Sequence, residues 1–299
     1  MDAPENADLT LVAILYHEDL DGIASAAVVL EYLDRLEEDV FGVLMPTNYD
    51  REPFEELSRY DELYMVDFCV AEEHLERWSS QGVTINVFDH HVGRKEVTQK
   101  WGVYADDESA VGITWRCLFR DRLGVPEEDM PMGVALVEDR DLWRWRWSET
   151  AAYTAALASF GNDPVTVRRL MFDADRDEDL LAIGERLVAQ QDAVIEDALA
   201  RVHDVVIGGV RFSAVNAGWP ISDLADAIGR ARPELPVVVY SIYGPDKVRL
   251  SLRDNTERGV NVREIAEALG GGGHDQAAGC YVTLQNLSDM VVGESESPA

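Results

Sequence analysis

Short apolar runs and longer amphipathic stretches alternate along the first part of the chain. Four apolar runs have the length and composition of buried strands, at residues 9–16, 41–45, 63–66 and 83–88. Amphipathic stretches with helical spacing predict helices at residues 23–37, 72–80 and 109–123. Strands that alternate with helices predict an α/β domain built on a parallel sheet.

Helical patterns dominate from residue 151 to about 202, and the last of them, from residue 178, is long enough to join two domains. Beyond it, strand patterns return at residues 205–207, 211–215, 237–243, 248–252 and 280–284. Helices are predicted at residues 221–228 and 262–269. We therefore expect an N-terminal domain at 1–177, a connecting helix at 178–203, a smaller α/β domain at 204–285 and a polar tail at 286–299.

Acidic residues exceed basic ones throughout the chain, with a formal net charge of −31 and a pI near 4.4. Only Lys95, Lys100 and Lys247 are lysines. The acidity fits either a basic partner or a salt-rich cytoplasm that screens the repulsion, and its even spread favours the second. It argues against a broad basic surface for long nucleic acids.

Other features of composition predict a cytoplasmic protein. No apolar run approaches the roughly 20 residues of a membrane span, and the acidic start of the sequence lacks the basic residues of a secretory signal. The three cysteines, Cys69, Cys117 and Cys280, lack metal-type spacing and predict reduced thiols. The sequence allows a homodimer but does not require one.

Ionisable residues follow the apolar runs that should form the sheet. The candidates are His17, Asp19 and Asp21 after the first run, Asp67 after the third, Asp89, His90 and His91 after the fourth, and Asp139 after the apolar residues 132–137. Parallel sheets place their ligand sites at the carboxyl ends of the strands. Single members have simpler interpretations, such as helix capping by Asp21. The repetition at three strand ends favours one shared site.

The residue types in this set suit divalent metal ions. Five converging carboxylates without cations would repel one another and raise each other's pKa values, and a pair of divalent ions removes this problem. Mixed carboxylate and imidazole ligands favour Mn²⁺, with Mg²⁺, Co²⁺ or Zn²⁺ as alternatives. Two such ions can hold a hydroxide and clamp an in-line displacement at phosphorus.

Two further segments have competing interpretations. Trp143, Trp145 and Trp147 alternate with arginines, a pattern that fits base stacking but that we interpret as packing on the core. The glycine run 270–273 before His274 fits a helix C-cap, but its length favours a nest of backbone amides that binds an anion.

The ordered motifs HEDLDG (17–22), MVDF (65–68), FDHH (88–91), VEDRD (137–141) and GGGGHDQAAG (270–279) resemble those of the DHH family of phosphoesterases with a DHH-associated C-terminal domain. The resemblance covers nearly the whole chain, and VEDRDLWRW is most similar to the oligoribonuclease (nanoRNase) branch. It implies a parallel-sheet DHH domain joined by the long helix to a smaller α/β domain, with the active site in the cleft between them.

The resemblance also implies roles for individual residues. Six would be metal ligands: His17 and Asp19 on the first ion, Asp67 bridging both ions, and Asp21, His90 and Asp139 on the second. Asp141 lies so close to Asp139 that either fits the fourth motif, and we choose Asp139 because it closely follows the apolar run. Asp89 would orient the histidines, and His91 would contact the scissile phosphate.

In the C-terminal domain, the resemblance implies that Gly271, Gly272, Gly273 and His274 hold the terminal phosphate or sugar of the substrate. Ser251 and Arg253 alternate onto one strand face and match the Ser-x-Arg that binds phosphate in the family. On spacing alone, Arg253 fits a surface ion pair equally well.

The implied function is two-metal hydrolysis of short oligoribonucleotides to nucleoside monophosphates. Alternatives are a cyclic mono- or dinucleotide phosphodiesterase, a phosphatase of 3′-phosphoadenosine phosphates, a single-strand exonuclease and, in another class, a non-catalytic nucleotide-binding or replication accessory protein. No basic run that would track a long strand is present, which disfavours the exonuclease.

Overall fold

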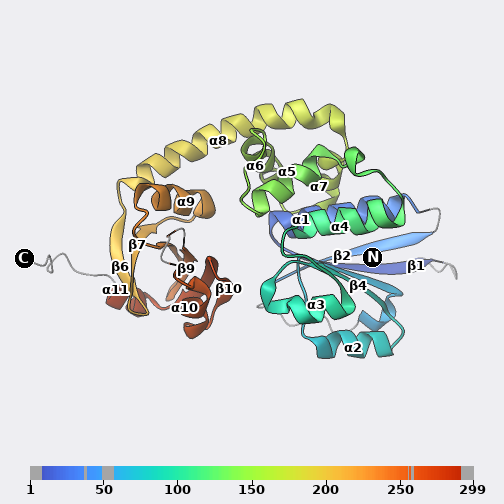
Figure 1. The fold of residues 1–299 in the computed structure, drawn as a ribbon, viewed down its shortest axis with the longest axis horizontal. Coiled ribbons are helices and arrows are strands. Elements are labelled where there is room, and N and C mark those ends of the chain that lie inside the picture. The colour runs from blue at the N-terminus through green and yellow to red at the C-terminus, as the bar shows by residue number, and fades with distance from the viewer. Residues whose placement is uncertain (1–8, 37–38, 49–56, 255, 257–258, 291–299) are drawn as a thin grey trace, which may run out of the picture. The chain divides into compact units, whose positions relative to one another are not determined.

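The computed structural model describes residues 9–36, 39–48, 57–254, 256 and 259–290. The chain divides into two compact units, residues 1–188 and residues 189–299, and each has its own sheet (Figure 1). The boundary falls inside the helix α8 (Asp177–Leu199), within the segment expected to connect two domains.

Unit 1 is built on a parallel five-stranded sheet with the order β2-β1-β3-β4-β5. Its strands are β1 (Thr10–His17), β2 (Val40–Thr47), β3 (Glu62–Val66), β4 (Thr84–Asp89) and β5 (Gly102–Tyr104). The first four agree with the apolar runs within two residues at each end. The three-residue strand β5, at the sheet edge, is too short to produce a periodic pattern and was not predicted.

Helices cover both faces of this sheet, with α1 and α4 on one face and α2 and α3 on the other (Figure 1). The helices of this unit before α8 are α1 (Leu20–Asp34), α2 (Glu72–Ser80), α3 (Lys95–Trp101), α4 (Ala110–Trp115), α5 (Met132–Asp141), α6 (Thr150–Ser159) and α7 (Pro164–Met171). Along β1, Val12 and Ile14 pack in the core with α1, while Ala13 and Leu15 pack in the core with α2. A strand buried on both faces explains the unbroken apolar run.

One predicted helix differs in form from the expectation. The segment 109–123 is α-helical only to Trp115 and continues as a π-helix over Arg116–Arg122. The pattern predicted its helical character but not the wider winding, because both windings bury nearly the same side of a short segment.

Unit 2 is built on a mixed six-stranded sheet with the order β10-β11-β9-β8-β7-β6. Its strands are β6 (His203–Ile207), β7 (Val210–Asn216), β8 (Val237–Gly244), β9 (Lys247–Arg253), β10 (Gly272–His274) and β11 (Ala277–Val282), and its helices after α8 are α9 (Ile221–Ala231), α10 (Val262–Ala268) and α11 (Leu284–Met290). The polar tail expected from residue 286 thus begins inside α11, and residues 291–299 lie outside the described part.

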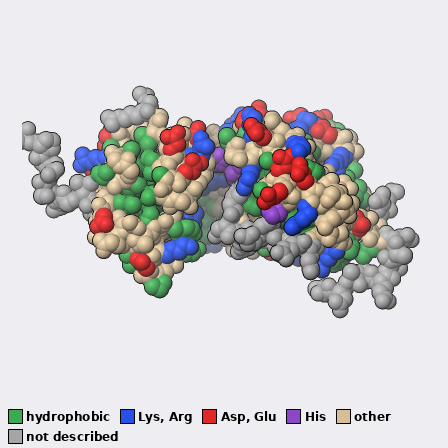
Figure 2. Space-filling model, turned by 90° about the horizontal axis from the view of Figure 1, so that it is seen from below, with side chains coloured by type: hydrophobic (Ala, Val, Ile, Leu, Met, Phe, Trp, Pro, Cys, Tyr) green, Lys and Arg blue, Asp and Glu red, His purple; other side chains and the backbone are tan. Residues whose placement is uncertain are grey.

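On the face that Figure 2 shows, both units carry acidic side chains, with arginine and lysine side chains among them. The described residues contain no helix long and apolar enough to cross a lipid bilayer.

Candidate metal centre

The carboxyl ends of β1, β3 and β4 bring the predicted ligands together. These three strands are neighbours and run parallel, so they end at one edge of the sheet. His17 is the last residue of β1, Asp67 directly follows β3, and Asp89 ends β4. This convergence is what the strand-end pattern predicted.

Three overlapping groups at this edge have the composition and spacing to hold metal ions, with ligand atoms within 4.8 Å of one another in each group. The groups are His17, Asp19 and Asp67; Asp67, His90 and His91; and Asp21, His90 and Asp141. Asp67 belongs to two groups, as a bridging ligand must. His91 also lies in a group, although the sequence suggested only a contact with the phosphate.

Asp67 is the centre of the site. Its side chain is only 1% exposed, and neither carboxylate oxygen accepts a hydrogen bond from the described residues. The nearest nitrogens, on His17, His90 and His91, lie 3.4–3.6 Å from these oxygens. Burial raises the pKa of Asp67, but these three histidines outweigh burial and hold it well below its usual range. A buried ionised carboxylate without hydrogen-bond donors fits a cation ligand.

Local backbone geometry positions His17 and Asp19. Asp19 is the N-cap of α1, and its carboxylate accepts hydrogen bonds from the Gly22 amide at 3.0 Å and pairs with His17 Nδ1 at 2.7 Å. Gly22 is required because a Cβ there would lie 2.3 Å from the His17 carbonyl oxygen. The helix cap and the ligand pair are therefore one structure, and the cap belongs to Asp19 rather than Asp21.

Asp21 has a structural partner as well as a place in the metal site. Its two carboxylate oxygens accept hydrogen bonds from the amides of Ala110 and Val111, at 2.7 and 2.9 Å, at the start of α4. Its Oδ2 also lies 3.9 Å from His90 Nε2. Asp21 thus ties the first turn of α1 to the first turn of α4 beside the ligand group.

Asp89 organises the two histidines that follow it. Its Oδ1 accepts hydrogen bonds from the amides of His90 and His91 and lies 2.7 Å from His91 Nδ1. The carboxylate is fully buried and fixes the orientation of the His91 ring. This geometry fits the orienting role expected for Asp89.

The choice of Asp139 as the fourth ligand does not agree with the geometry. Asp139 accepts hydrogen bonds from the Arg146 amide and from Thr150 Oγ1, at 2.9 and 2.6 Å, and lies in none of the three groups. Asp141 Oδ2 instead lies 3.6 Å from His90 Nε2. The apolar run and both aspartates belong to one helix, α5, in which Asp139 is buried while Asp141, two residues later, lies in a ligand group. Asp141 follows Val137 by four residues and Val134 by seven, which places the three residues on one face of a helix. This spacing was the signal in the sequence that favoured Asp141.

Protonation in this cluster follows from its dense negative charge. Burial lowers the pKa of His17 and His90, but neighbouring carboxylates outweigh it and raise these pKa values to about 11 and about 10. Burial raises the pKa of Asp141 to about 7. Protons therefore provide the positive charge that metal ions would provide, and this carboxylate and imidazole set fits Mn²⁺ or Mg²⁺ as well as borderline ions.

In unit 2, Ser251 and Arg253 lie on β9, as expected. Ser251 is buried, and the half-buried guanidinium of Arg253 donates to the Leu252 carbonyl at 2.9 Å and to Ser222 Oγ at 3.4 Å. Among the described residues Arg253 makes no ion pair with a carboxylate, unlike the surface pair that was its alternative. Burial and the charge of Arg249 lower its pKa. Ser222, on α9, had no sequence signal.

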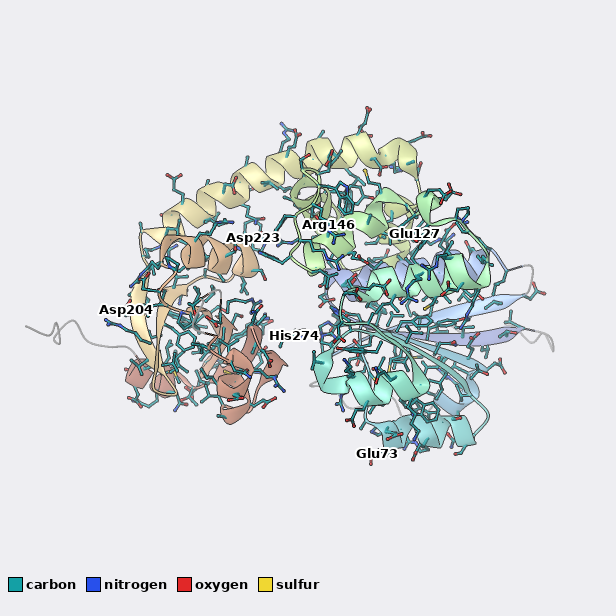
Figure 3. The ribbon with its side chains drawn as sticks, in the orientation of Figure 1. Glu73, Glu127, Arg146, Asp204, Asp223 and His274 are labelled. Carbon is teal, nitrogen blue, oxygen red and sulfur yellow. The ribbon has the colours of Figure 1, made fainter. Side chains whose placement is uncertain are left out.

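The glycine run is more ordered than the expected open loop. Gly270, with φ of +80°, ends α10, and Gly272–His274 forms β10, where His274 is labelled in Figure 3. A Cβ on Gly271 would lie 2.1 Å from the Gly279 carbonyl oxygen, and one on Gly273 would lie 2.5 Å from that of Ala277. Close packing therefore accounts for Gly271 and Gly273, while the positive φ of Gly270 agrees with the helix C-cap that was the alternative.

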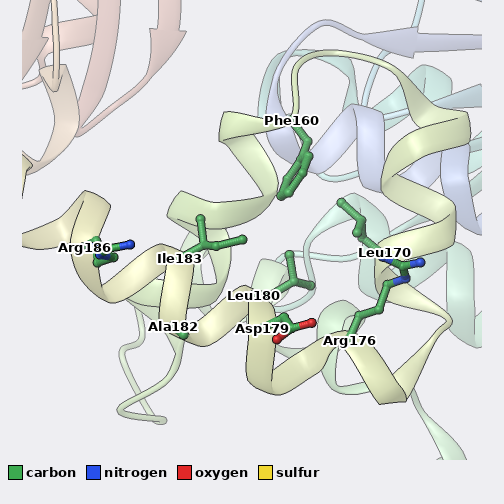
Figure 4. Close-up of a pocket in the computed structure, with 8 residues that line it drawn as sticks. All are labelled: Phe160, Leu170, Arg176, Asp179, Leu180, Ala182, Ile183 and Arg186. Carbon is green, nitrogen blue, oxygen red and sulfur yellow. The ribbon is translucent and has the colours of Figure 1, made fainter.

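Two other features lie apart from the ligand groups. A pocket of about 520 Å³ between α6, α7 and α8 is lined by residues such as Phe160, Leu170 and Ile183, and none of its lining residues belongs to the metal groups (Figure 4). Of the tryptophans after α5, Trp143 is half-buried, whereas Trp145 and Trp147 are 38% and 44% exposed, so packing on the core does not describe these two.

Comparisons with known proteins agree with this architecture. The chain is 27% identical to the oligoribonuclease NrnB of Bacillus subtilis over 93% of its own length and 74% of that protein. Its fold is similar to RecJ of Thermus thermophilus in complex with Mn²⁺ (TM-score 0.60, 19% identity, 93% of this chain and 50% of that one). It is also similar to the pGpG-specific phosphodiesterase PggH of Vibrio cholerae (TM-score 0.52, 14% identity, 94% and 95%).

Family models match both units. Residues 11–135 match the N-terminal domain of the DHH family, and residues 200–292 match the DHHA1 domain. The first match contains the ends of β1, β3 and β4, and the second contains β9 and the glycine run. The chain therefore belongs to the DHH family of phosphoesterases, with a DHHA1 domain in its second unit.

Proposed function

We propose that this protein is a phosphodiesterase that uses two divalent ions to hydrolyse short oligoribonucleotides to nucleoside monophosphates. The observation that carries the proposal is the shared position of Asp67 between two ligand groups at one sheet edge. The similarity to NrnB over most of the chain supports the substrate class.

Each proposed ion has its own set of ligands. His17, Asp19 and Asp67 would hold one ion, and Asp21, His90 and Asp141 the other. Asp67 would also reach the second ion, because it forms a further group with His90, whose Nε2 lies 3.4 Å from Asp67 Oδ1. Mn²⁺ is the preferred candidate, and such a pair supplies an activated water and neutralises charge at phosphorus. Asp141 replaces Asp139 in this assignment because Asp139 is engaged with Arg146 and Thr150.

We propose that His91 contacts the scissile phosphate and that Asp89 orients the His91 ring. Asp89 holds His91 Nδ1 at 2.7 Å, which fixes the ring so that Nε2 would donate a hydrogen bond to a phosphate oxygen or a proton to the leaving oxygen. Burial lowers the pKa of His91, but Asp89 and Asp67 outweigh burial and raise it above its usual value.

In the second unit, Ser251 and Arg253 would bind the terminal phosphate of the substrate together with Gly271, Gly272, Gly273 and His274. Arg253 supports this role because its half-buried charge has hydroxyl and carbonyl partners but no described carboxylate. An anionic substrate would supply the missing negative charge.

The test is a product assay with Mn²⁺ in high salt, since the net charge of −31 also leads us to propose adaptation to salt. Substrates are an RNA dinucleotide, a 5-mer, a 24-mer, a cyclic dinucleotide, 3′,5′-cyclic AMP and 3′-phosphoadenosine phosphate. Rapid loss of the dinucleotide and 5-mer with the 24-mer spared is the expected result.

Other outcomes would replace the proposal with one of its alternatives. Turnover of only the cyclic substrates would indicate a cyclic nucleotide phosphodiesterase, and degradation of the 24-mer at a comparable rate would indicate an exonuclease. Turnover of 3′-phosphoadenosine phosphate alone would indicate a phosphatase. Mn²⁺ binding without turnover would indicate a non-catalytic nucleotide-binding protein.

A further inference from the structure

The loop between α5 and α6 exposes aromatic rings beside the metal centre. Trp143 is half-buried, and 38% of Trp145 is exposed. Trp143 follows the proposed ligand Asp141 by two residues, and two peptide units span at most about 7 Å. Any group that stacks on these rings would therefore lie close to a phosphate held at the metal centre.

The backbone of this loop is strained where it presents the rings. Trp143 and Trp145 have φ of 53° and 54°, and Asp67 is the third non-glycine residue with positive φ among the described residues. Bulky L-residues rarely adopt this conformation, which is energetically costly and is found most often at functional sites. The strain thus occurs at the bridging position of the metal centre and at the two rings.

Side chains from α5 hold the loop in this conformation. Asp139 accepts a hydrogen bond from the Arg146 amide, in the loop where Arg146 is labelled in Figure 3. Arg144 Nη1 donates to Glu138 Oε1 at 2.9 Å. The rings are therefore preorganised and would lose little entropy on binding a ligand.

Arg140 adds positive charge to the same surface. Its guanidinium carbon lies 4.4 Å from the Trp143 ring centroid and 4.8 Å from that of Trp145, and the two rings meet edge to face with centroids 5.0 Å apart. We call Arg140, Trp143 and Trp145 the tryptophan platform. An exposed aromatic ring with a cation over one of its faces matches a nucleobase attached to a phosphate.

We propose that the tryptophan platform stacks the base of the nucleotide next to the scissile phosphate, with Trp145 as its main contact. This inference rests on the proposed function and deepens it. A platform that binds one base, in a chain whose sequence has no basic run to track a long strand, would give affinity to substrates of very few nucleotides. Stacking tolerates any base, so we expect little preference for sequence.

The test compares two small probes that differ only in the base, adenosine 5′-monophosphate and ribose 5-phosphate. Calorimetric titration of the Mn²⁺-loaded protein should show that Trp145→Ala weakens binding of the nucleotide by about 5- to 100-fold. Binding of ribose 5-phosphate should change less than about twofold. Trp145→Phe, which keeps a ring, should restore most of the affinity.

Phe160→Ala is the matched control, because Phe160 is a similarly exposed aromatic (44%) of unit 1 outside the metal groups. Equal affinity of wild type and Trp145→Ala for the nucleotide would overturn the inference, as would wild-type affinity for the nucleotide no greater than for ribose 5-phosphate. Failure of the wild type to cleave RNA dinucleotides, with the Trp145 effect intact, would instead reject the proposed function and retain the platform.

Discussion

The sheet edge of unit 1 and strand β9 of unit 2 bury side chains of opposite charge. At the sheet edge, Asp67 is buried without a hydrogen-bond donor among the described residues, and neighbouring carboxylates raise the pKa values of His17 and His90. On β9, Arg253 is half-buried without a described carboxylate, and its pKa is lowered. The first region gathers carboxylates whose charge raises the pKa of its histidines, and the second buries a cation without a described carboxylate.

The largest expected effect removes the bridging carboxylate. Asp67→Ala should reduce metal-dependent turnover by more than about 100-fold, since even residues that only support metal ligands contribute 10- to 100-fold. Steady-state rates with an RNA dinucleotide and Mn²⁺ binding by calorimetry measure this. Lys95→Ala, at an exposed surface position, is the control. Retained turnover in Asp67→Ala would remove the bridging role.

Substitutions of Asp141 and Asp139 distinguish a metal ligand from a residue that stabilises the fold. Asp141→Asn should weaken Mn²⁺ binding and turnover strongly without lowering the melting temperature of the metal-free protein. Asp139→Ala should instead lower the unfolding free energy by about 1.5–3 kcal/mol, because its bonds to Arg146 and Thr150 are lost. The reverse pattern would restore Asp139 as the ligand.

Proton release on metal binding tests the balance at the sheet edge. In the metal-free protein the pKa values of His17 and His90 are about 11 and about 10, so both rings carry a proton at pH 7. Metal ligation requires neutral rings. Mn²⁺ affinity should therefore rise with pH, by about tenfold per pH unit for each proton released. Titrations at pH 6.5 and 7.5 in two buffers of different ionisation enthalpy give the proton count, and a count of zero would contradict this assignment.

The missing anion on β9 is tested by Arg253→Gln. We expect KM for an RNA dinucleotide to rise about tenfold, because charged hydrogen bonds to phosphate are lost, while Mn²⁺ affinity stays unchanged. Arg249→Gln is the matched control, since Arg249 is an exposed arginine four residues earlier on the same strand. Equal effects of the two substitutions would indicate general electrostatics rather than a phosphate site.

The smallest effects concern the glycine run. Gly271→Ala should lower the unfolding free energy by about 1–3 kcal/mol, because the new Cβ would lie 2.1 Å from the Gly279 carbonyl oxygen. Gly272 has open space around it, so Gly272→Ala should leave stability nearly unchanged. Chemical denaturation measures both, and equal losses would show that the run as a whole is required for folding.

Much of the fold could be predicted because buried parallel strands leave unbroken apolar runs. The strand ends also predicted which residues converge near Asp67, since parallel strands share one carboxyl edge. The choice between Asp139 and Asp141 could not be made from distance to the apolar run. Asp139 was chosen because it closely follows that run, whereas the geometry of α5 places Asp141 in a ligand group.

Other features depend on contacts that are distant in sequence. Close approach of β11 explains Gly271 and Gly273, and no local pattern records it. The exposure of Trp145 depends on backbone torsions that an alternating pattern cannot specify. The contact between Ser222 and Arg253 joins residues from α9 and β9.

Asp21 links assembly of the metal centre to completion of the fold. It bonds to the amides of Ala110 and Val111, which are 89 and 90 residues away along the chain, so its carboxylate reaches its place only when α4 has docked on α1. An ion that requires Asp21 would consequently bind the native state and not partly folded chains. Bound metal would then stabilise the folded state of unit 1. Removal of the metal would make the chain more prone to unfolding and proteolysis, even without substrate.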